Sequence, residues 1–214
     1  MLQVKIVPVT AFAQNCSIVW DSVTKDAILI DAGGDAQRLR QEVDALGLTV
    51  KAMWLTHGHF DHAGAVGELN QYWDVPVIGP HQDDAFWLDM IQDVCARYHF
   101  PIPQPVEVTQ WLKGGEVLTL GEHQFEVRFT PGHTPGHVIF YNAENKLLWT
   151  GDVLFKGSIG RTDFPKSNHA QLIESIQTQC FTLPDDTRFI CGHGEMSTIG
   201  YEKQHNPFLS GKAG

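Results

Sequence analysis

Apolar and polar side chains alternate through residues 2–9, with the two-residue period of a half-buried strand. Shorter apolar runs predict further strands at 16–20, 27–31 and 51–56. Residues 36–46 instead repeat apolar positions every three or four residues, which predicts a helix. The beginning of the chain is therefore expected to interleave strands with a helix.

The pattern continues with two more helices and a second group of strands. Helices are predicted over 63–73 and 82–98, with a short strand at 76–79 between them. A proline-rich stretch at 100–105 leads into the second half. The elements predicted there are strands at 117–120, 124–130, 137–141, 146–150 and 188–191, and a helix over 168–179. Elements in this order predict two sheets packed face to face, with the helices outside.

Length and composition narrow the class of protein. The 214 residues, 43% of them hydrophobic, predict one domain spanning 1–214. The formal net charge of -10 and the lack of a basic run argue against a nucleic-acid partner, because phosphates require clustered lysine and arginine. No secretion signal begins the chain, and no apolar stretch approaches the roughly 20 residues that span a bilayer. We therefore expect a cytoplasmic protein without a membrane partner.

The four cysteines are scattered through the chain and form no C-x-x-C pair. A domain of this size does not need disulfides to hold its core, so we expect free, buried thiols. Histidine is the more informative residue, because many of the eleven histidines fall in three short glycine-rich segments.

The segment 57–62 reads His-Gly-His-Phe-Asp-His and lies on the loop between a predicted strand and a predicted helix. It places four metal-capable side chains within six residues, and Gly58 lets the backbone fold closely enough for them to converge. One histidine alone would more often be a core or turn residue, but four such side chains together predict a metal site. Imidazole and carboxylate ligands suit zinc, iron or manganese.

One further loop and two strand ends supply the other candidates. Residues 130–137 contain His133 and His137 among glycines and prolines, and we expect one to be a ligand and the other to support it. Asp152 follows a predicted strand, and His193 follows the last strand between two glycines. Taken singly, neither is good evidence for a metal ligand. An aspartate after a strand is more often a turn residue, and an isolated His-Gly pair is equally weak evidence.

In combination, H-x-H-x-D-H, P-G-H, T-G-D and G-H-G resemble the metal-binding motifs of the metallo-β-lactamase superfamily, and Asp31 resembles that family's early structural aspartate. The resemblance implies an α/β fold, a single-domain αββα sandwich with its site at the edge between the sheets. It also implies two divalent cations, with zinc as the first candidate and iron or manganese as alternatives. The implied ligands are His57, His59 and His133 for the first cation, Asp61, His62 and His193 for the second, and Asp152 as the bridge.

Within the superfamily, the chain is most similar to the hydroxyacylglutathione hydrolases, or type II glyoxalases, in their short bacterial form. Asp152 stands where secreted β-lactamases lack a carboxylate, and His59 stands where flavodiiron proteins have a glutamate. Residues 206–208 resemble the N-P-F segment of type II glyoxalases, although Ser210 follows where the longer enzymes carry an arginine. Their helical C-terminal extension is missing, so we expect a more open pocket.

The loop at 160–165 is similar to one found in type II glyoxalases and also in persulfide dioxygenases. In the glyoxalases it carries a basic residue that contacts glutathione, which implies that Arg161 binds the substrate. The open alternative is that Arg161 pairs with a nearby acid such as Asp163.

The resemblance implies a hydrolase that cleaves the thioester of S-lactoylglutathione or a related hydroxyacylglutathione, a reaction of methylglyoxal detoxification. Two cations sharing a water would lower its pKa and hold the hydroxide against the carbonyl. Asp152 would bridge the cations and Asp61 would orient the hydroxide. The main alternative is a mononuclear iron dioxygenase acting on glutathione persulfide through His57, His133 and Asp152. A non-catalytic binding protein is a third class, but it has no need of seven converging ligands.

Overall fold

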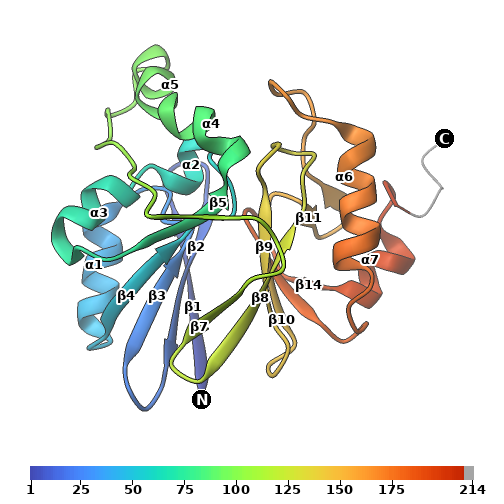
Figure 1. Ribbon diagram of the computed structural model, residues 1–214, viewed down its shortest axis with the longest axis horizontal. Coiled ribbons are helices and arrows are strands. Elements are labelled where there is room, and N and C mark those ends of the chain that lie inside the picture. The colour runs from blue at the N-terminus through green and yellow to red at the C-terminus, as the bar shows by residue number, and fades with distance from the viewer. Residues whose placement is uncertain (210–214) are drawn as a thin grey trace.

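Two six-stranded sheets face each other and carry helices on their outer sides (Figure 1), in a computed structural model that describes residues 1–209. In order across the first sheet lie β1 (Leu2–Val9), β2 (Gln14–Asp21), β3 (Asp26–Ile30), β4 (Thr49–Trp54), β5 (Val77–His81) and β6 (Gln110–Leu112). In order across the second lie β14 (Ser197–Thr198), β13 (Arg188–Cys191), β10 (Leu147–Gly151), β9 (Val138–Asn142), β8 (His123–Phe129) and β7 (Val117–Leu120). A small hairpin of β11 (Leu154–Phe155) and β12 (Ser158–Ile159) follows β10.

The helices complete an αββα sandwich, as the sequence predicts. Against the first sheet lie α1 (Ala36–Ala45), α2 (Phe60–Ala63), α3 (Val66–Trp73), α4 (Ala85–Asp89) and α5 (Ile91–Arg97), and against the second lie α6 (His169–Ser175) and α7 (Ile199–His205). Neighbouring side chains in β4 point to opposite faces, so Met53 packs towards α1 and α3 while Trp54 packs between the sheets. There the Trp54 ring meets Phe125 at 5.0 Å and Phe140 at 5.3 Å between centroids. A third apolar cluster, which includes Leu172 of α6, fills the space behind the second sheet.

Strand direction brings the candidate ligand loops to one edge of the sandwich. β3 and β4 are parallel, as are β10 and β13, so the carboxyl ends within each pair coincide. β8 and β10 both pair antiparallel to β9 and so run in the same direction. The loops that follow these strands therefore converge, which agrees with the implied position of the site between the sheets.

The elements differ from the predictions in several places. The helix predicted over 82–98 is broken into a 3₁₀ turn (Gln82–Asp84), α4 and α5, which meet at Met90. The helix predicted over 63–73 is also split. The first part, α2, begins earlier and spans Phe60–Ala63, and the second part, α3, begins at Val66. The helix predicted over 168–179 ends as α6 at Ser175 and continues as a π-helical turn (Ile176–Cys180). Sequence patterns missed β6, β11, β12, β14 and α7, of which the four strands have only two or three residues each.

All four cysteines are free and buried, which confirms the expectation from their spacing. Among residues 1–209, no helix has the length and apolar character that a membrane crossing requires.

Candidate metal centre

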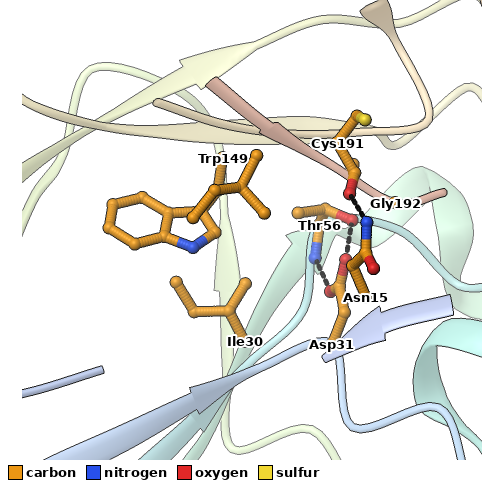
Figure 2. A pocket seen from close by; sticks show the side chains of 9 residues that line it. Asn15, Ile30, Asp31, Thr56, Trp149, Cys191 and Gly192 are labelled. Carbon is orange, nitrogen blue, oxygen red and sulfur yellow. Dashed lines mark hydrogen bonds between the residues drawn. The ribbon is translucent and has the colours of Figure 1, made fainter. Parts of the chain in front are cut away.

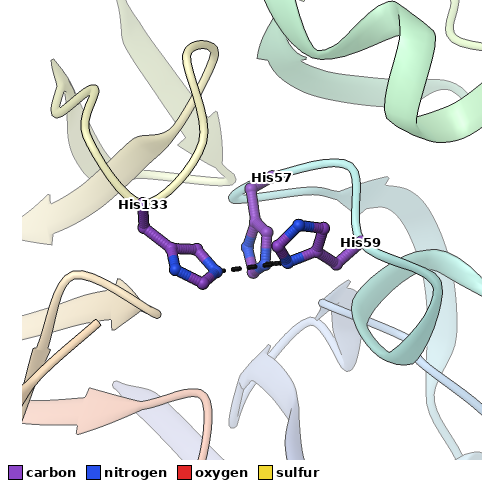
Figure 3. Close-up of side chains that lie close together, drawn as sticks. All are labelled: His57, His59 and His133. Atoms are coloured by element: carbon purple, nitrogen blue, oxygen red, sulfur yellow. Dashed lines mark hydrogen bonds between the residues drawn. The ribbon is translucent and has the colours of Figure 1, made fainter. Parts of the chain in front are cut away.

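Three buried histidines from two loops form the first cluster (Figure 3). His57 and His59 lie on the loop after β4, and His133 lies on the loop after β8. The Nδ1 atom of His59 lies 3.2 Å from Nε2 of His57 and 3.1 Å from Nε2 of His133. Three ring nitrogens therefore converge on one point.

Hydrogen bonds on the far side of two of these rings fix which nitrogen carries the proton. The Thr56 hydroxyl donates to Asp31 Oδ2 at 2.6 Å, so its oxygen is left to accept Nδ1–H of His57 at 3.0 Å. The carbonyl of Arg161 can only accept, so it takes Nδ1–H of His133 at 2.8 Å. Nε2 of both histidines then carries a lone pair that faces the cluster.

Asp61, His62 and His193 form the second cluster. Asp61 Oδ2 lies 4.0 Å from Nε2 of His62 and 3.3 Å from Nε2 of His193. His62 donates Nδ1–H to Asp31 Oδ2 at 2.9 Å, and His193 donates Nδ1–H to the carbonyl of Phe12 at 3.1 Å. These bonds again turn the Nε2 atoms towards the cluster.

Asp152 lies between the clusters. Its Oδ1 is 3.3 Å from Nε2 of His62, and its Oδ2 is 3.6 Å from Nε2 of His133 and 3.7 Å from Nε2 of His193. His137 stays outside both clusters, where its Nε2 accepts the backbone N–H of Asp152 at 3.1 Å. His137 also lies 3.2 Å through Nδ1 from the hydroxyl of Thr130, so it contacts both Asp152 and the loop that carries His133. The assignment of His133 as the ligand and His137 as the support stays a prediction.

Asp31 and Thr56 lie beneath the two clusters and are joined by the hydrogen bonds that Figure 2 shows. Asp31 Oδ1 accepts the backbone N–H of Thr56 at 2.8 Å, in addition to the two bonds at Oδ2. A cavity of about 10 Å³ adjoins them and is bounded on its far side by Trp149 and Ile30. Its volume suits one water molecule.

Burial and charge give the two clusters different protonation preferences. Burial and the neighbouring imidazoles hold the pKa of His57 well below its ordinary value, and burial and His133 lower the pKa of His59 to about 3. Burial disfavours a charged His62, but the carboxylate of Asp152 and its other acidic neighbours hold its pKa well above the ordinary value. Burial likewise opposes ionisation of Asp152, yet His62 and other histidines hold its pKa well below normal. The first cluster is thus neutral, whereas without a metal His62 of the second cluster holds a proton on Nε2 that a bound cation would replace.

The donor set fits divalent cations. Nε2 of His62 and Oδ1 of Asp152 are fully buried and lie 3.3 Å apart without a well-aligned hydrogen bond, although buried polar atoms are nearly always paired. Both atoms lie where the lone pairs of the clusters meet. A cation in each cluster would give these atoms partners, and imidazole with carboxylate is a ligand set for zinc, iron or manganese.

Two buried acids that the sequence patterns gave no reason to select support the loops around the site. Asp84 accepts hydrogen bonds from both loops of the first cluster. Glu202 accepts the N–H of Gly157 at 2.9 Å and a side-chain N–H of Asn206 at 2.9 Å. Asn206, in the N-P-F segment, also donates to the carbonyl of Ser158 at 3.0 Å, so here it ties α7 to the β11–β12 hairpin. Ser210, which was compared with an arginine of the longer enzymes, lies outside the described residues.

Arg161 borders the first cluster through its backbone, but its guanidinium already has a partner. Nε and Nη2 donate to the two carboxylate oxygens of Asp163 at 2.9 and 2.8 Å, which is the pairing that the sequence left open. Both side chains are largely exposed, at 67% and 65%. Substrate binding by Arg161 stays a prediction.

A cluster of three histidines and a cluster of two histidines and an aspartate, joined by Asp152 at the edge of an αββα sandwich, are typical of metallo-hydrolases. A family model described as the metallo-beta-lactamase superfamily matches residues 9–193, and the chain belongs to that superfamily. It is similar to the hydroxyacylglutathione hydrolase GloC of Haemophilus influenzae, with 45% identity over 213 residues, 99% of this chain and 100% of the relative.

Solved structures show the same fold. The BLEG-1 B3 metallo-beta-lactamase has a TM-score of 0.90 and 37% identity over 98% of this chain and 100% of its own. TTHA1623, in a di-iron-bound form, has a TM-score of 0.87 and 35% identity over 96% and 100%. ETHE1 from Myxococcus xanthus has a TM-score of 0.81 and 27% identity over 98% and 85%.

Proposed function

We propose that the chain is a two-metal hydrolase of glutathione thioesters, with S-lactoylglutathione or a related hydroxyacylglutathione as its substrate. The observation that carries the proposal is the joining of the two clusters through Asp152, whose carboxylate oxygens lie 3.3–3.7 Å from histidines of both. The glutathione part draws support from the likeness to GloC, which extends over both whole chains.

His57, His59 and His133 would hold the first cation, Asp61, His62 and His193 the second, and Asp152 both. When bound, two such cations would make water nucleophilic near neutral pH and withdraw electron density from a carbonyl oxygen. Zinc is the first candidate, and the di-iron form of TTHA1623 supports iron as the alternative.

The protein's own groups then have three tasks. The Asp61 carboxylate, 15% exposed, accepts a hydrogen bond from the attacking water and orients it. Phe164 and Trp87 pack their rings 4.8 and 4.5 Å from the ring of His59 and limit the approach of bulk water on that side. No general acid is needed for the leaving group, because a thiolate is a weak base.

Arg161 is proposed to bind a carboxylate of the glutathione moiety. Its present partner, Asp163, does not prevent this, because an ion pair between two exposed side chains contributes little and exchanges readily with a ligand. The guanidinium can hold a carboxylate through two parallel hydrogen bonds, as it now holds Asp163.

The test is thiol release from S-lactoylglutathione by zinc-loaded and iron-loaded protein, with and without oxygen. We expect equal rates in both atmospheres, loss of the reaction in His59→Ala, and normal rates in His205→Ala, which removes an exposed histidine outside the site. A β-lactam substrate should be assayed in parallel because of the likeness to BLEG-1.

The persulfide dioxygenase remains the second candidate, and the likeness to ETHE1 gives it some support, at a lower identity than that to GloC. That reaction would use His57, His133 and Asp152 alone and would consume oxygen. Oxygen uptake with glutathione persulfide, together with no thioester cleavage by either metal form, would replace the proposed function with this alternative.

A further inference from the structure

Asp84 is a buried carboxylate outside both clusters. Its Oδ2 accepts the backbone N–H of Gly58 at 2.9 Å and the hydroxyl of Thr134 at 2.7 Å, and its Oδ1 accepts the backbone N–H of Gly136 at 2.6 Å. One carboxylate therefore links a loop from the first sheet to a loop from the second. It has no cationic partner among residues 1–209 that would explain its burial as half of an ion pair.

Two of these bonds reach residues next to ligands of the first cluster, and the third reaches Gly136, next to His137. Gly58 separates His57 from His59, and Thr134 directly follows His133. Within the described part of the chain, Asp84 makes no hydrogen bond to a residue of the second cluster. The direct contacts of Asp84 therefore lie beside first-cluster ligands, whereas Asp61 and His62 are reached only through the backbone that follows Gly58.

Glycine at both loop positions makes this contact sterically possible. A Cβ atom on Gly58 would lie 2.9 Å from the Asp84 carbonyl oxygen and 2.8 Å from Cβ of Trp87. A Cβ atom on Gly136 would lie 2.5 Å from the backbone nitrogen of Asp84. Such distances are too short for any larger residue, so both loops are shaped to receive the segment that carries Asp84.

We propose that Asp84 is a positioning residue that sets the affinity of the first cluster for its cation and leaves the affinity of the second cluster unchanged. The loops after β4 and β8 belong to different sheets, so their histidines keep a common geometry only while the loops are joined. Asp84 joins them before a cation arrives, which removes the need to order the ligands on binding. The inference rests on the two-cation assignment proposed above, and it is independent of the identity of the substrate.

The experiment measures Zn²⁺ affinity of metal-free protein by competition with a chromophoric chelator. His193→Ala disables the second cluster and leaves the first to be measured, and His133→Ala does the reverse. Asp84→Asn is then introduced into each background. We expect a loss of about 10–100-fold in the His193→Ala background and less than about 3-fold in the His133→Ala background. Asp83→Asn, the same change at the exposed neighbouring residue, should alter neither affinity.

Equal losses in both backgrounds, or no loss in the His193→Ala background, would overturn the proposal. If Asp84→Asn fails to fold, Thr134→Val removes only one of the three donors and should weaken the first cluster about 3–10-fold with the same selectivity; no selective loss there counts equally against the proposal. A wild-type chain that binds a single cation, and binds it more weakly in Asp84→Asn, would support Asp84 while rejecting the two-cation assignment.

Discussion

Asp31→Asn should destabilise the metal-free protein and weaken the second cluster, although the change is isosteric. Asp31 has a positive φ of 57°, which asparagine also adopts, so the backbone should not change. An amide keeps only one acceptor oxygen. If that oxygen stays on the N–H of Thr56, the amide NH₂ faces the Thr56 hydroxyl and Nδ1–H of His62. His62 must then move its proton to Nε2, where it no longer offers a lone pair to a cation.

If the amide turns over instead, the backbone N–H of Thr56 loses its buried acceptor, at a cost of about 1–3 kcal/mol. The two remaining bonds lose their charge assistance, which costs about 1 kcal/mol each. We therefore expect the free energy of unfolding of the metal-free protein to fall by about 3–5 kcal/mol in urea titrations. Affinity for the second cation should fall about 10–100-fold.

The matched control is Asp35→Asn. Asp35 also has a positive φ, 51°, but it is exposed, and its carboxylate caps the N–H of Thr10 away from the site. The control should change stability by less than about 1 kcal/mol and leave metal binding unaltered. A free energy of unfolding for Asp31→Asn that equals the control value would refute the account of Asp31 as the anchor of both clusters.

Elemental analysis of protein loaded with metal should give two cations per chain, and a ceiling of one would contradict the joined clusters. Asp152→Ala should lower metal affinity about 10–100-fold and reduce turnover with it, because the two cations lose their shared negative ligand; full loading with near-normal turnover would show that Asp152 is not the bridge. Arg161→Ala should raise KM for an acyl-glutathione about 3–10-fold with little change in kcat, because a remote carboxylate is held equally in ground and transition states. As a control, Asp163→Ala frees the guanidinium and should not raise KM. An unchanged KM in Arg161→Ala would show that Arg161 does not bind the substrate and only pairs with Asp163.

The candidate ligands, which the structure brings together, could be selected from the sequence because the pattern that marks them is local. Four candidates lie within residues 57–62, and the others stand beside glycines at strand ends, so short patterns suffice to mark them. The alternation in β1 and the helical period in α1 were likewise sufficient to predict these two elements, because each has eight or more residues. Strands of two or three residues, such as β11 and β14, are too short for a period to be read.

Asp84 shows what local patterns miss. It stands beside Asp83 in a stretch with helical periodicity, where charged residues normally mark the solvent face. Its partners come from loops more than 20 residues before and about 50 residues after it, and the helix breaks where the carboxylate turns inward. The role of Arg161 could not be predicted for a different reason. A basic residue two positions from an acid can form an ion pair with it or bind a ligand, and the sequence does not distinguish the two.

The candidate ligands are spread along the chain from residue 57 to residue 193, so metal binding also depends on complete folding. The donors meet only when both sheets have docked, so a partly unfolded chain that releases either sheet loses the site as a whole. Cations that bind the native chain alone add RT ln(1 + [L]/Kd) to its stability, about 2.7 kcal/mol at a free concentration one hundred times Kd. The lifetime of the chain in a cell would then depend on metal supply, since a chain deprived of metal would unfold and be degraded more often.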